Sequence, residues 1–376
     1  MKVLFPFVGD SIGGSHNSVM ELYNVLKDSS IVPIFVLHKK GPLSDLFDKL
    51  NIQYKYIHID HLAGDSPSLF KISFYMVFNF YQIIKFIYKN KIDAVHGNDL
   101  RINLTWSLPT RLSGSIYIWH QRSIISSSLL WRVIPVLANH FISISKYVHN
   151  SLPINISNHN KTLVLNPFNT KKKYKKSESR RWLNELYGIP SNSVLLGYIG
   201  RLVDWKNLDF LINCFAEYSN KSDKSLHLII VGTGGDEYIS FLTALVDKLN
   251  INNIVTFAGF NADPSRVIAA FDLMVAPSNK EPFGRTLVES MIQKTPVLAA
   301  RGGGHSEIID NGVTGRFYNH LDIDDFISQC DICINNGPEV KIINNANIIA
   351  YSKYSSSQHA ENIIQIYQKH YSYSIT

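Results

Sequence analysis

The sequence predicts a two-domain α/β protein, and three observations support this fold class. The chain has 376 residues, more than a single hydrophobic core usually organises. Short apolar runs typical of strands alternate along it with segments of helical periodicity. A lysine-rich run at 171–176 interrupts this alternation and is typical of a solvated linker. We therefore expect domains at 1–167 and 168–355, followed by a terminal helix at 356–376.

Seven strands are expected in the first domain. A glycine-bearing turn with Gly13 and Gly14 follows the first strand and leads into an amphipathic helix over His16–Lys27. The turn lacks the G-x-G-x-x-G spacing, so a dinucleotide-binding fingerprint is not supported. The expected strands are Lys2–Val8, Ile31–Leu37, Tyr54–Ile59, Ile92–His96, Ile116–His120, Phe141–Ser145 and Thr162–Leu165.

An aromatic segment, Phe70–Tyr88, is long enough to raise the question of a membrane span. Its polar residues recur at intervals of three and four and predict one polar stripe on a broadly apolar helix. They are Lys71, Asn79, Gln82, Lys85 and Lys89. We expect a buried crossover helix, with an interfacial membrane helix as the alternative.

In the second domain, Val194–Ile199 is a predicted strand, and Gly200 and Arg201 stand at its carboxyl end. Lys206 follows near the start of the next helix. Carboxyl ends of parallel strands are where open α/β sheets bind ligands. Arg supplies a planar fork of donors and Lys a compact charge, so together they could neutralise a diphosphate.

Two carboxylates, Glu281 and Glu289, flank a Pro-Phe-Gly turn that follows the strand Asp272–Ala276. Helical periodicity begins near Gly284. The amides of Gly284, Arg285 and Thr286 lie in the first turn, have no intrahelical acceptor and form an anion site suited to phosphate.

Carboxylates beside a phosphate site would repel the phosphate, so their presence is explained if the ligand has hydroxyl groups on both sides of its phosphate. A nucleotide sugar has this layout, because its diphosphate lies between the ribose and the sugar, and carboxylates accept hydrogen bonds from diols. Glu281 would then face the sugar and Glu289 the ribose.

The frame E-P-F-G-x-x-x-x-E resembles the paired-glutamate signature of retaining family 4 glycosyltransferases, of the bacterial cell-surface polysaccharide type. Further matching motifs occur in the family's order over 195–317. They are Gly200-Arg201-Leu202, Lys206-Asn207, Ile229–Gly234, Val255–Gly259, Pro277-Ser278, Gly302-Gly303-Gly304 and Glu307.

The resemblance implies the GT-B fold, with two Rossmann-like domains facing across a cleft and a C-terminal helix returning to the first. It implies no metal and no cofactor. A histidine that contacts the donor sugar is matched by His120, although Gln121 stands where the family usually has Asp. The implied catalytic residues are Glu281, Arg201, Lys206 and His120, and the implied donor-binding residues are Gly13, Gly14, Phe283, Gly284, Arg285, Thr286 and Glu289.

The expected reaction is transfer of a sugar, with retention, from a UDP- or GDP-linked donor to a glycan acceptor. A polyprenyl-diphosphate-linked oligosaccharide in O-antigen, lipopolysaccharide or capsule synthesis is the candidate acceptor. A sugar-nucleotide epimerase, a phosphorylase and a catalytically silent partner subunit are the alternatives.

The chain is basic, with 37 Lys and Arg against 30 Asp and Glu and a net charge of +7. These cations are not concentrated in a nucleic-acid-binding motif, so no nucleic acid partner is expected. Together with the lysine run and the aromatic helix, these cations suggest that the protein binds an anionic membrane surface. Only three cysteines and a first strand without a signal segment favour a cytoplasmic protein, peripheral on the inner membrane.

Overall fold

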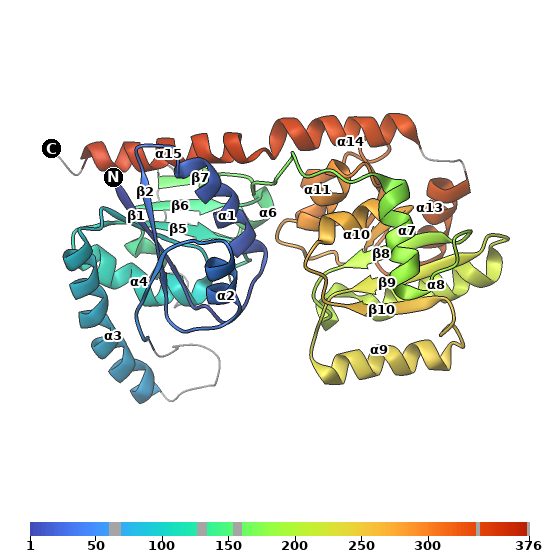
Figure 1. The fold of residues 1–376 in the computed structure, drawn as a ribbon, viewed down its shortest axis with the longest axis horizontal. Helices are drawn as coiled ribbons and strands as arrows, with labels where there is room; N and C mark the ends of the chain where they lie inside the picture. The colour runs from blue at the N-terminus through green and yellow to red at the C-terminus, as the bar shows by residue number, and fades with distance from the viewer. Residues whose placement is uncertain (60–68, 126–133, 153–159, 336–338, 374–376) are drawn as a thin grey trace. The chain divides into compact units, whose positions relative to one another are not determined.

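The computed structural model describes residues 1–59, 69–125, 134–152, 160–335 and 339–373. The chain divides into two compact units (Figure 1). The first unit comprises Met1–Pro167 together with Ser356–Thr376, and the second comprises Phe168–Ser355.

The first unit contains a parallel sheet of seven strands in the order β3-β2-β1-β4-β5-β6-β7. The strand order reverses between β1 and β4, and ligands of open α/β sheets bind beyond the carboxyl ends of strands at such a point. The strands are β1 Lys2–Phe7, β2 Val32–Leu37, β3 Tyr54–Tyr56, β4 Ala94–Gly97, β5 Ile116–Gln121, β6 His140–Ser143 and β7 Lys161–Leu163. The described helices are α1 Gly14–Leu26, α2 Pro42–Lys49, α3 Leu69–Asn90, α4 Leu100–Leu112, η1 Ile134–Leu137, α6 Lys146–His149 and α15 Ser356–Tyr373.

Both faces of this sheet are buried, as expected of parallel strands covered by helices. Val3 and Phe5 of β1 share one core with α1, α2 and α15, while Leu4 shares another with α3 and α4. Helix α15 packs against α1, so the C-terminal segment is part of the first unit. The predicted return of this helix to the first domain is confirmed.

Helix α3 confirms the predicted helix but corrects its burial pattern. Ile83 and Ile87 are buried, whereas Tyr81 and Tyr88 are 68% and 63% exposed. Asn79, which we placed on the polar stripe, is only 3% exposed. The described half of the helix is therefore amphipathic and not buried on all sides; the side chain of Lys71 lies outside the described residues. Across the part of the chain that the structure describes, no helix combines the length and apolarity needed to cross a membrane.

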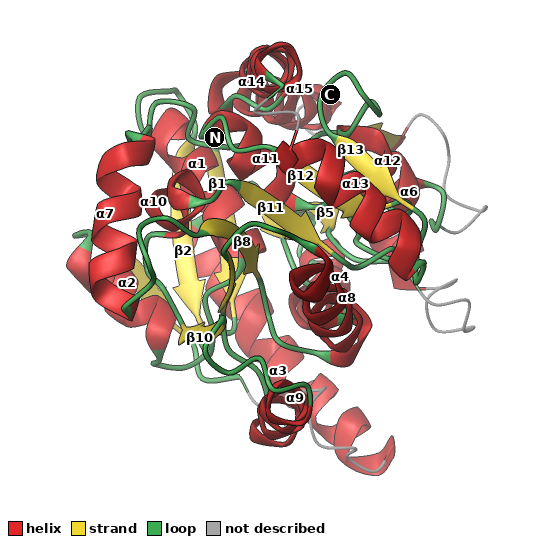
Figure 2. Cartoon of the chain, turned by 90° about the vertical axis from the view of Figure 1, so that its right-hand side faces the viewer, coloured by secondary structure: helices red, strands yellow, loops and turns green. Residues whose placement is uncertain are grey.

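The second unit contains a parallel sheet of six strands in the order β10-β9-β8-β11-β12-β13. Helices α8, α9 and α13 share a core with one face of it, and α10 and α11 contact strands β8 and β11 (Figure 2). The strands are β8 Val194–Ile199, β9 Leu226–Val231, β10 Val255–Gly259, β11 Leu273–Ala276, β12 Val297–Ala300 and β13 Arg316–Tyr318. The helices are α7 Lys176–Tyr187, η3 Asp204–Lys206, α8 Leu208–Lys221, α9 Asp236–Lys248, α10 Pro264–Ala270, α11 Arg285–Ile292, α12 His305–Ile308, α13 Ile323–Asn335 and α14 Val340–Lys353.

The sequence analysis assigned no helix to α14. The fully buried positions of this helix are Ala346 and Ala350, whereas Ile348 is 66% exposed. Small buried residues and a large exposed one give little hydrophobic periodicity, although the helix packs against α11.

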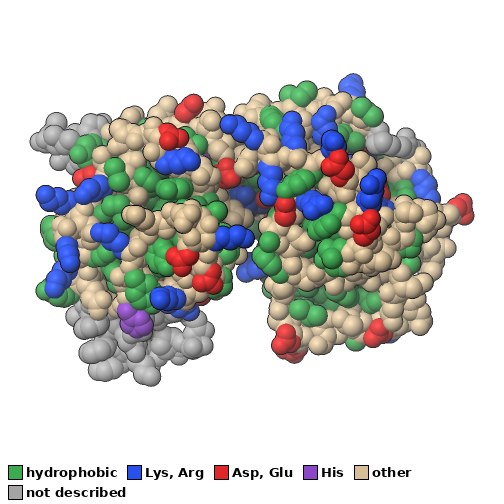
Figure 3. Space-filling view, viewed as in Figure 1, with side chains coloured by type: hydrophobic (Ala, Val, Ile, Leu, Met, Phe, Trp, Pro, Cys, Tyr) green, Lys and Arg blue, Asp and Glu red, His purple; other side chains and the backbone are tan. Residues whose placement is uncertain are grey.

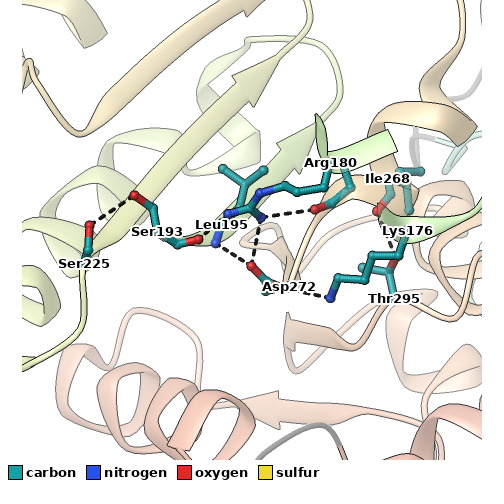
Figure 4. A network of polar contacts seen from close by, with 9 residues as sticks. Lys176, Arg180, Ser193, Leu195, Ser225, Ile268, Asp272 and Thr295 are labelled. Carbon is teal, nitrogen blue, oxygen red and sulfur yellow. Dashed lines mark hydrogen bonds and ion pairs between the residues drawn. The ribbon is translucent and has the colours of Figure 1, made fainter. Parts of the chain in front are cut away.

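A polar network around Asp272 fixes α7 to the amino ends of strands β8 and β11 (Figure 4). The Asp272 carboxylate contacts Lys176 Nζ at 2.8 Å and Arg180 Nη1 at 2.9 Å, and it accepts the Leu195 amide at 2.8 Å. Burial opposes ionisation of this carboxyl group, but these partners outweigh burial and lower the pKa of Asp272 below 3.8. Arg180 also donates to the carbonyl oxygen of Ser193.

Replacing Asp272 with Asn is expected to lower the free energy of unfolding at pH 7 by about 2 kcal/mol, because Arg180 loses its counter-charge in a mostly buried position. A carboxylate whose folded-state pKa is lowered stabilises above its unfolded pKa, and this contribution disappears as the pH falls through the folded value. The difference between wild type and variant, measured by urea denaturation, should narrow below pH 3.8. As a control, Glu178→Gln removes an exposed pair and should change stability by less than about 0.5 kcal/mol.

Candidate functional site

Two loops of the second unit meet at the carboxyl edge of its sheet. One follows β8 and the other follows β11, and these strands are neighbours in the sheet. Ser278 Oγ donates to the carbonyl oxygen of Trp205 at 3.1 Å, and Asn207 Nδ2 donates to that of Pro277 at 3.2 Å. These two hydrogen bonds fix the loops to each other and bring Lys206 beside Glu281.

Lys206 and Glu281 form an ion pair through Nζ and Oε1. Their side chains are only 14% and 15% exposed, so each charge lies in a site largely removed from water. Lys206 Nζ also lies 4.3 Å from the centre of the Trp205 ring. An ammonium group has three N–H donors, so Lys206 can keep Glu281 and still donate to another anion.

The turn that separates Glu281 from α11 depends on glycine. Gly284 has a φ of 106°, and a Cβ there would lie 2.7 Å from Cδ2 of His305. The glycine turn after β12 supports the same loop from the other side. A Cβ at Gly303 would lie 2.7 Å from the carbonyl oxygen of Glu281, which accepts the Gly304 amide at 2.8 Å. The two turns therefore pack backbone against backbone around Glu281.

Helix α11 begins at Arg285, so the amides of Arg285 and Thr286 lie in its first turn, as predicted. Such amides have no intrahelical acceptor, and the positive end of the helix dipole lies behind them. Helix α11 therefore begins where the sequence predicts, and anion binding by its first turn stays a prediction.

Glu289 lies on the same helix and contacts Arg285, with Oε1 3.5 Å from Nη2. Burial raises the pKa of Glu289, and the nearby Arg285 charge offsets part of that rise. The guanidinium of Arg285 lies 4.3 Å from the centre of the Phe168 ring. Phe283 is 4% exposed and packs between Phe168 and Tyr354. The contacts of Phe283 are those of a core residue, and its donor-binding role stays a prediction.

Arg201 follows β8 after Gly200, and its side chain is exposed. Tyr198 Oη donates to its carbonyl oxygen at 2.9 Å, which fixes the backbone of this residue at the sheet edge. The structure thus places Arg201, Lys206, Glu281 and the first turn of α11 on loops at one edge of the second unit.

His120 is the penultimate residue of β5 in the first unit and has no exposed surface. Its ring contacts His96, with Nδ1 3.1 Å from His96 Nε2. Gln121, at the position where the family has Asp, accepts from Trp119 Nε1 at 2.7 Å and donates to the Ser123 carbonyl oxygen at 2.6 Å. Gln121 therefore has a structural function, and contact of His120 with a sugar stays a prediction.

Gly13 and Gly14 begin helix α1. The Gly13 amide donates to His16 Nδ1 at 3.0 Å, and a Cβ added to Gly13 would find its nearest neighbour 3.9 Å away. Packing within the first unit therefore leaves room for a side chain at Gly13, and the role of this glycine pair in donor binding stays a prediction.

The same edge of the first unit carries cations. Arg101 donates to Asp10 at 2.7 and 3.1 Å, and Lys39 Nζ lies 3.6 Å from the same carboxylate. Burial opposes ionisation of Asp10, but Arg101 and Lys39 outweigh it and lower the pKa of Asp10 to about 2. Two cations therefore share this carboxylate, and the hydrogen bond to Asp10, together with the nearby Asp99 charge, raises the pKa of Arg101.

Sequence reasoning missed His305. It is 1% exposed, packs under Gly284, and directly follows the quoted glycine run, which was the available signal. Burial lowers the pKa of His305, while the nearby Glu281 charge partly opposes this. Within the described ranges, no three His, Cys, Asp or Glu side chains are grouped as metal ligands would be.

Residues 183–353 match the family of glycosyl transferases group 1. The chain is 29% identical over 184 residues to an uncharacterized glycosyltransferase of Methanocaldococcus jannaschii, covering 48% of this chain and 46% of the relative. It is 30% identical over 156 residues to the D-inositol 3-phosphate glycosyltransferase of Mycobacterium sp. (strain KMS), covering 40% and 34%. It is 33% identical over 133 residues to the N-acetyl-alpha-D-glucosaminyl L-malate synthase of Bacillus anthracis, covering 35% and 34%. The chain therefore spans less than half the length of each relative.

Solved structures that resemble the chain over nearly its whole length include the following two. Anabaena HepE in complex with UDP-glucose superposes with a TM-score of 0.84 at 22% identity, covering 98% of this chain and 100% of HepE. The lipopolysaccharide outer core galactosyltransferase WaaB superposes with a TM-score of 0.71 at 20% identity, covering 98% and 100%. The fold is therefore GT-B, and residues 183–353 are similar to the glycosyl transferases of group 1.

Proposed function

We propose that this protein transfers a sugar, with retention of anomeric configuration, from a nucleotide-sugar donor to a glycan acceptor. The observation that carries the proposal is the partly buried Lys206–Glu281 pair beside the first turn of α11. This arrangement combines an anion site with a carboxylate, as a diphosphate joined to a sugar requires.

The demanding step is departure of the nucleoside diphosphate. The bond between the anomeric carbon and the phosphate oxygen breaks, and its electron pair leaves with the diphosphate. Arg201, Lys206 and the amides of Arg285 and Thr286 would stabilise that developing negative charge. Glu281 would orient the sugar and stabilise positive charge at the anomeric carbon. The acceptor oxygen then bonds to that carbon on the face the diphosphate has left, and its proton passes to a leaving phosphate oxygen.

UDP-glucose is the first donor to test, because the similarly folded HepE binds it. Thermal unfolding with UDP-, GDP- and ADP-sugars should show the largest stabilisation with one base, since a ligand stabilises the state that binds it. The reaction is then followed by NMR with that donor and a lipid-linked oligosaccharide. A product that keeps the donor's anomeric configuration supports the proposal. Epimerised donor without an acceptor, or phosphorolysis, would instead support one of the alternative activities.

A polyprenyl-diphosphate-linked glycan is the acceptor class we favour. The cations Lys39 and Arg101, which share Asp10 at the carboxyl edge of the first sheet, would suit its diphosphate. Two of the relatives are named for anionic molecules, D-inositol 3-phosphate and L-malate.

Such an acceptor would bring the protein to an anionic membrane, and the structure changes which surface we expect to bind it. Most of the lysine run makes contacts within the second unit. Lys172 pairs with Asp263 at 2.9 Å, Lys175 with Glu178 at 2.9 Å and Lys176 with Asp272 at 2.8 Å. On the face of this unit shown in Figure 3, Lys and Arg are interleaved with Asp and Glu. The run is therefore less available to lipid than its sequence suggests.

Helix α3 offers a better surface. Tyr81, Lys85, Tyr88 and Lys89 are all exposed on its described half, and Lys85 Nζ lies 5.9 Å from the centre of the Tyr81 ring. Tyrosine and lysine both suit a membrane interface, where an apolar body meets charged headgroups.

We expect the protein to sediment with vesicles that contain acidic phospholipid and to be released as the salt concentration rises. Lys85→Gln with Lys89→Gln should weaken this binding about tenfold or more, because each basic residue near the surface contributes about 1 kcal/mol. Lys172→Gln with Lys175→Gln removes the same charge and is the matched control. Equal loss in both double variants would refute binding through α3, and no sedimentation at low salt would refute membrane binding itself.

A further inference from the structure

Three buried side chains in the first unit form a chain that links the terminal helix to the end of β5. Tyr367 Oη of α15 hydrogen-bonds with His96 Nδ1 of β4. His96 Nε2 then lies 3.1 Å from His120 Nδ1. None of the three side chains has any exposed surface. The His359 ring is stacked with that of His120, with ring centres 6.1 Å apart.

The hydrogen-bonded side chains of Tyr367, His96 and His120 are all electrically neutral. Burial lowers the pKa of His96 and of His120 well below 6.5, and the nearby Arg122 charge lowers both further. Burial also raises the pKa of Tyr367, so its hydroxyl keeps its proton. A neutral imidazole has one N–H donor and one acceptor nitrogen. The hydrogen bonds of such a chain can therefore be donated in either of two directions. The contacts among its three members do not determine which direction is adopted.

Arg122 determines the direction in which these hydrogen bonds are donated. Its Nη2 lies 3.4 Å from His120 Nδ1, and its guanidinium donates to Asn98 Oδ1 at 2.7 Å and to Asn166 Oδ1 at 2.6 Å. At 3.4 Å the contact with His120 is long for a hydrogen bond. A guanidinium has only N–H donors, however, and it favours a lone pair over a second N–H. His120 Nδ1 is thus the acceptor, and the remaining proton positions follow from it.

We propose that Tyr367, His96 and Arg122 are positioning residues that hold His120 with its proton on Nε2, so that His120 serves as a hydrogen-bond donor and not as a base. Tyr367 donates to His96 Nδ1, His96 Nε2 donates to His120 Nδ1, and His120 Nε2–H ends the chain. Among the described residues His120 Nε2 is buried without a hydrogen-bond partner. A buried donor without an acceptor is costly, and an oxygen of a bound sugar would satisfy it once the groups that bury Nε2 move aside. The hydrogen bond from His120 to a sugar rests on the proposed function. The position of the proton on His120 does not depend on that function.

The test is NMR of the full-length protein with ¹⁵N-labelled histidine, at a pH well above 6.5 and without substrate. The His120 signals are identified by their loss in His120→Gln. We expect the proton on Nε2 in the wild type. Arg122→Met should move a measurable share of the population to Nδ1–H, whereas Arg122→Lys keeps a cationic donor and should retain Nε2–H.

A wild-type proton on Nδ1 would overturn the proposal without any variant. An unchanged tautomer in a folded Arg122→Met protein would overturn the assignment of Arg122. A merely structural arginine would affect stability and leave the proton position unchanged. Because no donor or acceptor is added, this experiment can succeed even if the proposed transfer reaction is wrong.

Discussion

Replacing Glu281 with Gln is expected to lower the rate of sugar transfer by about two to three orders of magnitude, the range for removal of a preorganised electrostatic group. The amide keeps the shape of the side chain but cannot stabilise positive charge at the anomeric carbon. Lys206 loses the counter-charge that it contacts in the structure. UDP should therefore bind the variant at least as tightly as the wild type, because the ammonium is free to donate to phosphate.

The measurements are single-turnover transfer from the best donor and calorimetric titration with UDP. Glu178→Gln is the matched control, since it removes a carboxylate from an exposed ion pair of the same unit. Near wild-type turnover in Glu281→Gln would show that the charge of Glu281 is not used. Parallel loss of UDP affinity would indicate that Glu281 mainly shapes the phosphate site.

Replacing Lys206 and Arg201 together with Ala is expected to lower the transfer rate by at least as much and to weaken UDP binding more than uridine binding. Charge-assisted hydrogen bonds contribute about 1.5–3 kcal/mol each, so loss of Lys206 alone should weaken UDP binding more than tenfold. The effect should fall on the diphosphate, because both cations lie on the loop after β8, beside the first turn of α11.

Lys221→Ala removes a solvent-exposed lysine paired with Glu217 and serves as the control. Equal losses of affinity for uridine and UDP would contradict the assignment to the diphosphate. Lys206→Ala also leaves Glu281 without its partner in a mostly buried site, so stability should be measured beside activity.

Local signals in the sequence were sufficient for the seven strands of the first unit, for β8 and β11, and for the start of α11. Most of these strands are short apolar runs bounded by turn residues, and the run Val194–Ile199 coincides with β8. The start of α11 follows from Gly284, whose conformation only glycine adopts readily, and from the helical periodicity after it. The GT-B fold prediction is confirmed.

Contacts between residues far apart in the sequence could not be predicted from such local signals. Lys206 and Glu281 were both predicted site residues, but their direct contact depends on β8 and β11 being neighbours in the sheet. The lysine run was predicted to be a solvated linker. Its ion pairs with Asp263 and Asp272, which lie on distant elements, could not be predicted from its sequence. Asn79 likewise lies in the core although its spacing placed it on the polar stripe.

The sequence by itself therefore predicted which residues would surround a diphosphate, and it located many of the strands and the helices α1, α3, α11 and α15, because hydrophobic period and turn chemistry act over a few neighbouring residues. The tertiary structure alone decided which charges are already paired and which way the protons of the buried chain at His120 run. Pairing and tautomer depend on contacts between segments far apart in the sequence, such as Tyr367 with His96. Sheet order and helix packing set those contacts, and no local pattern records them.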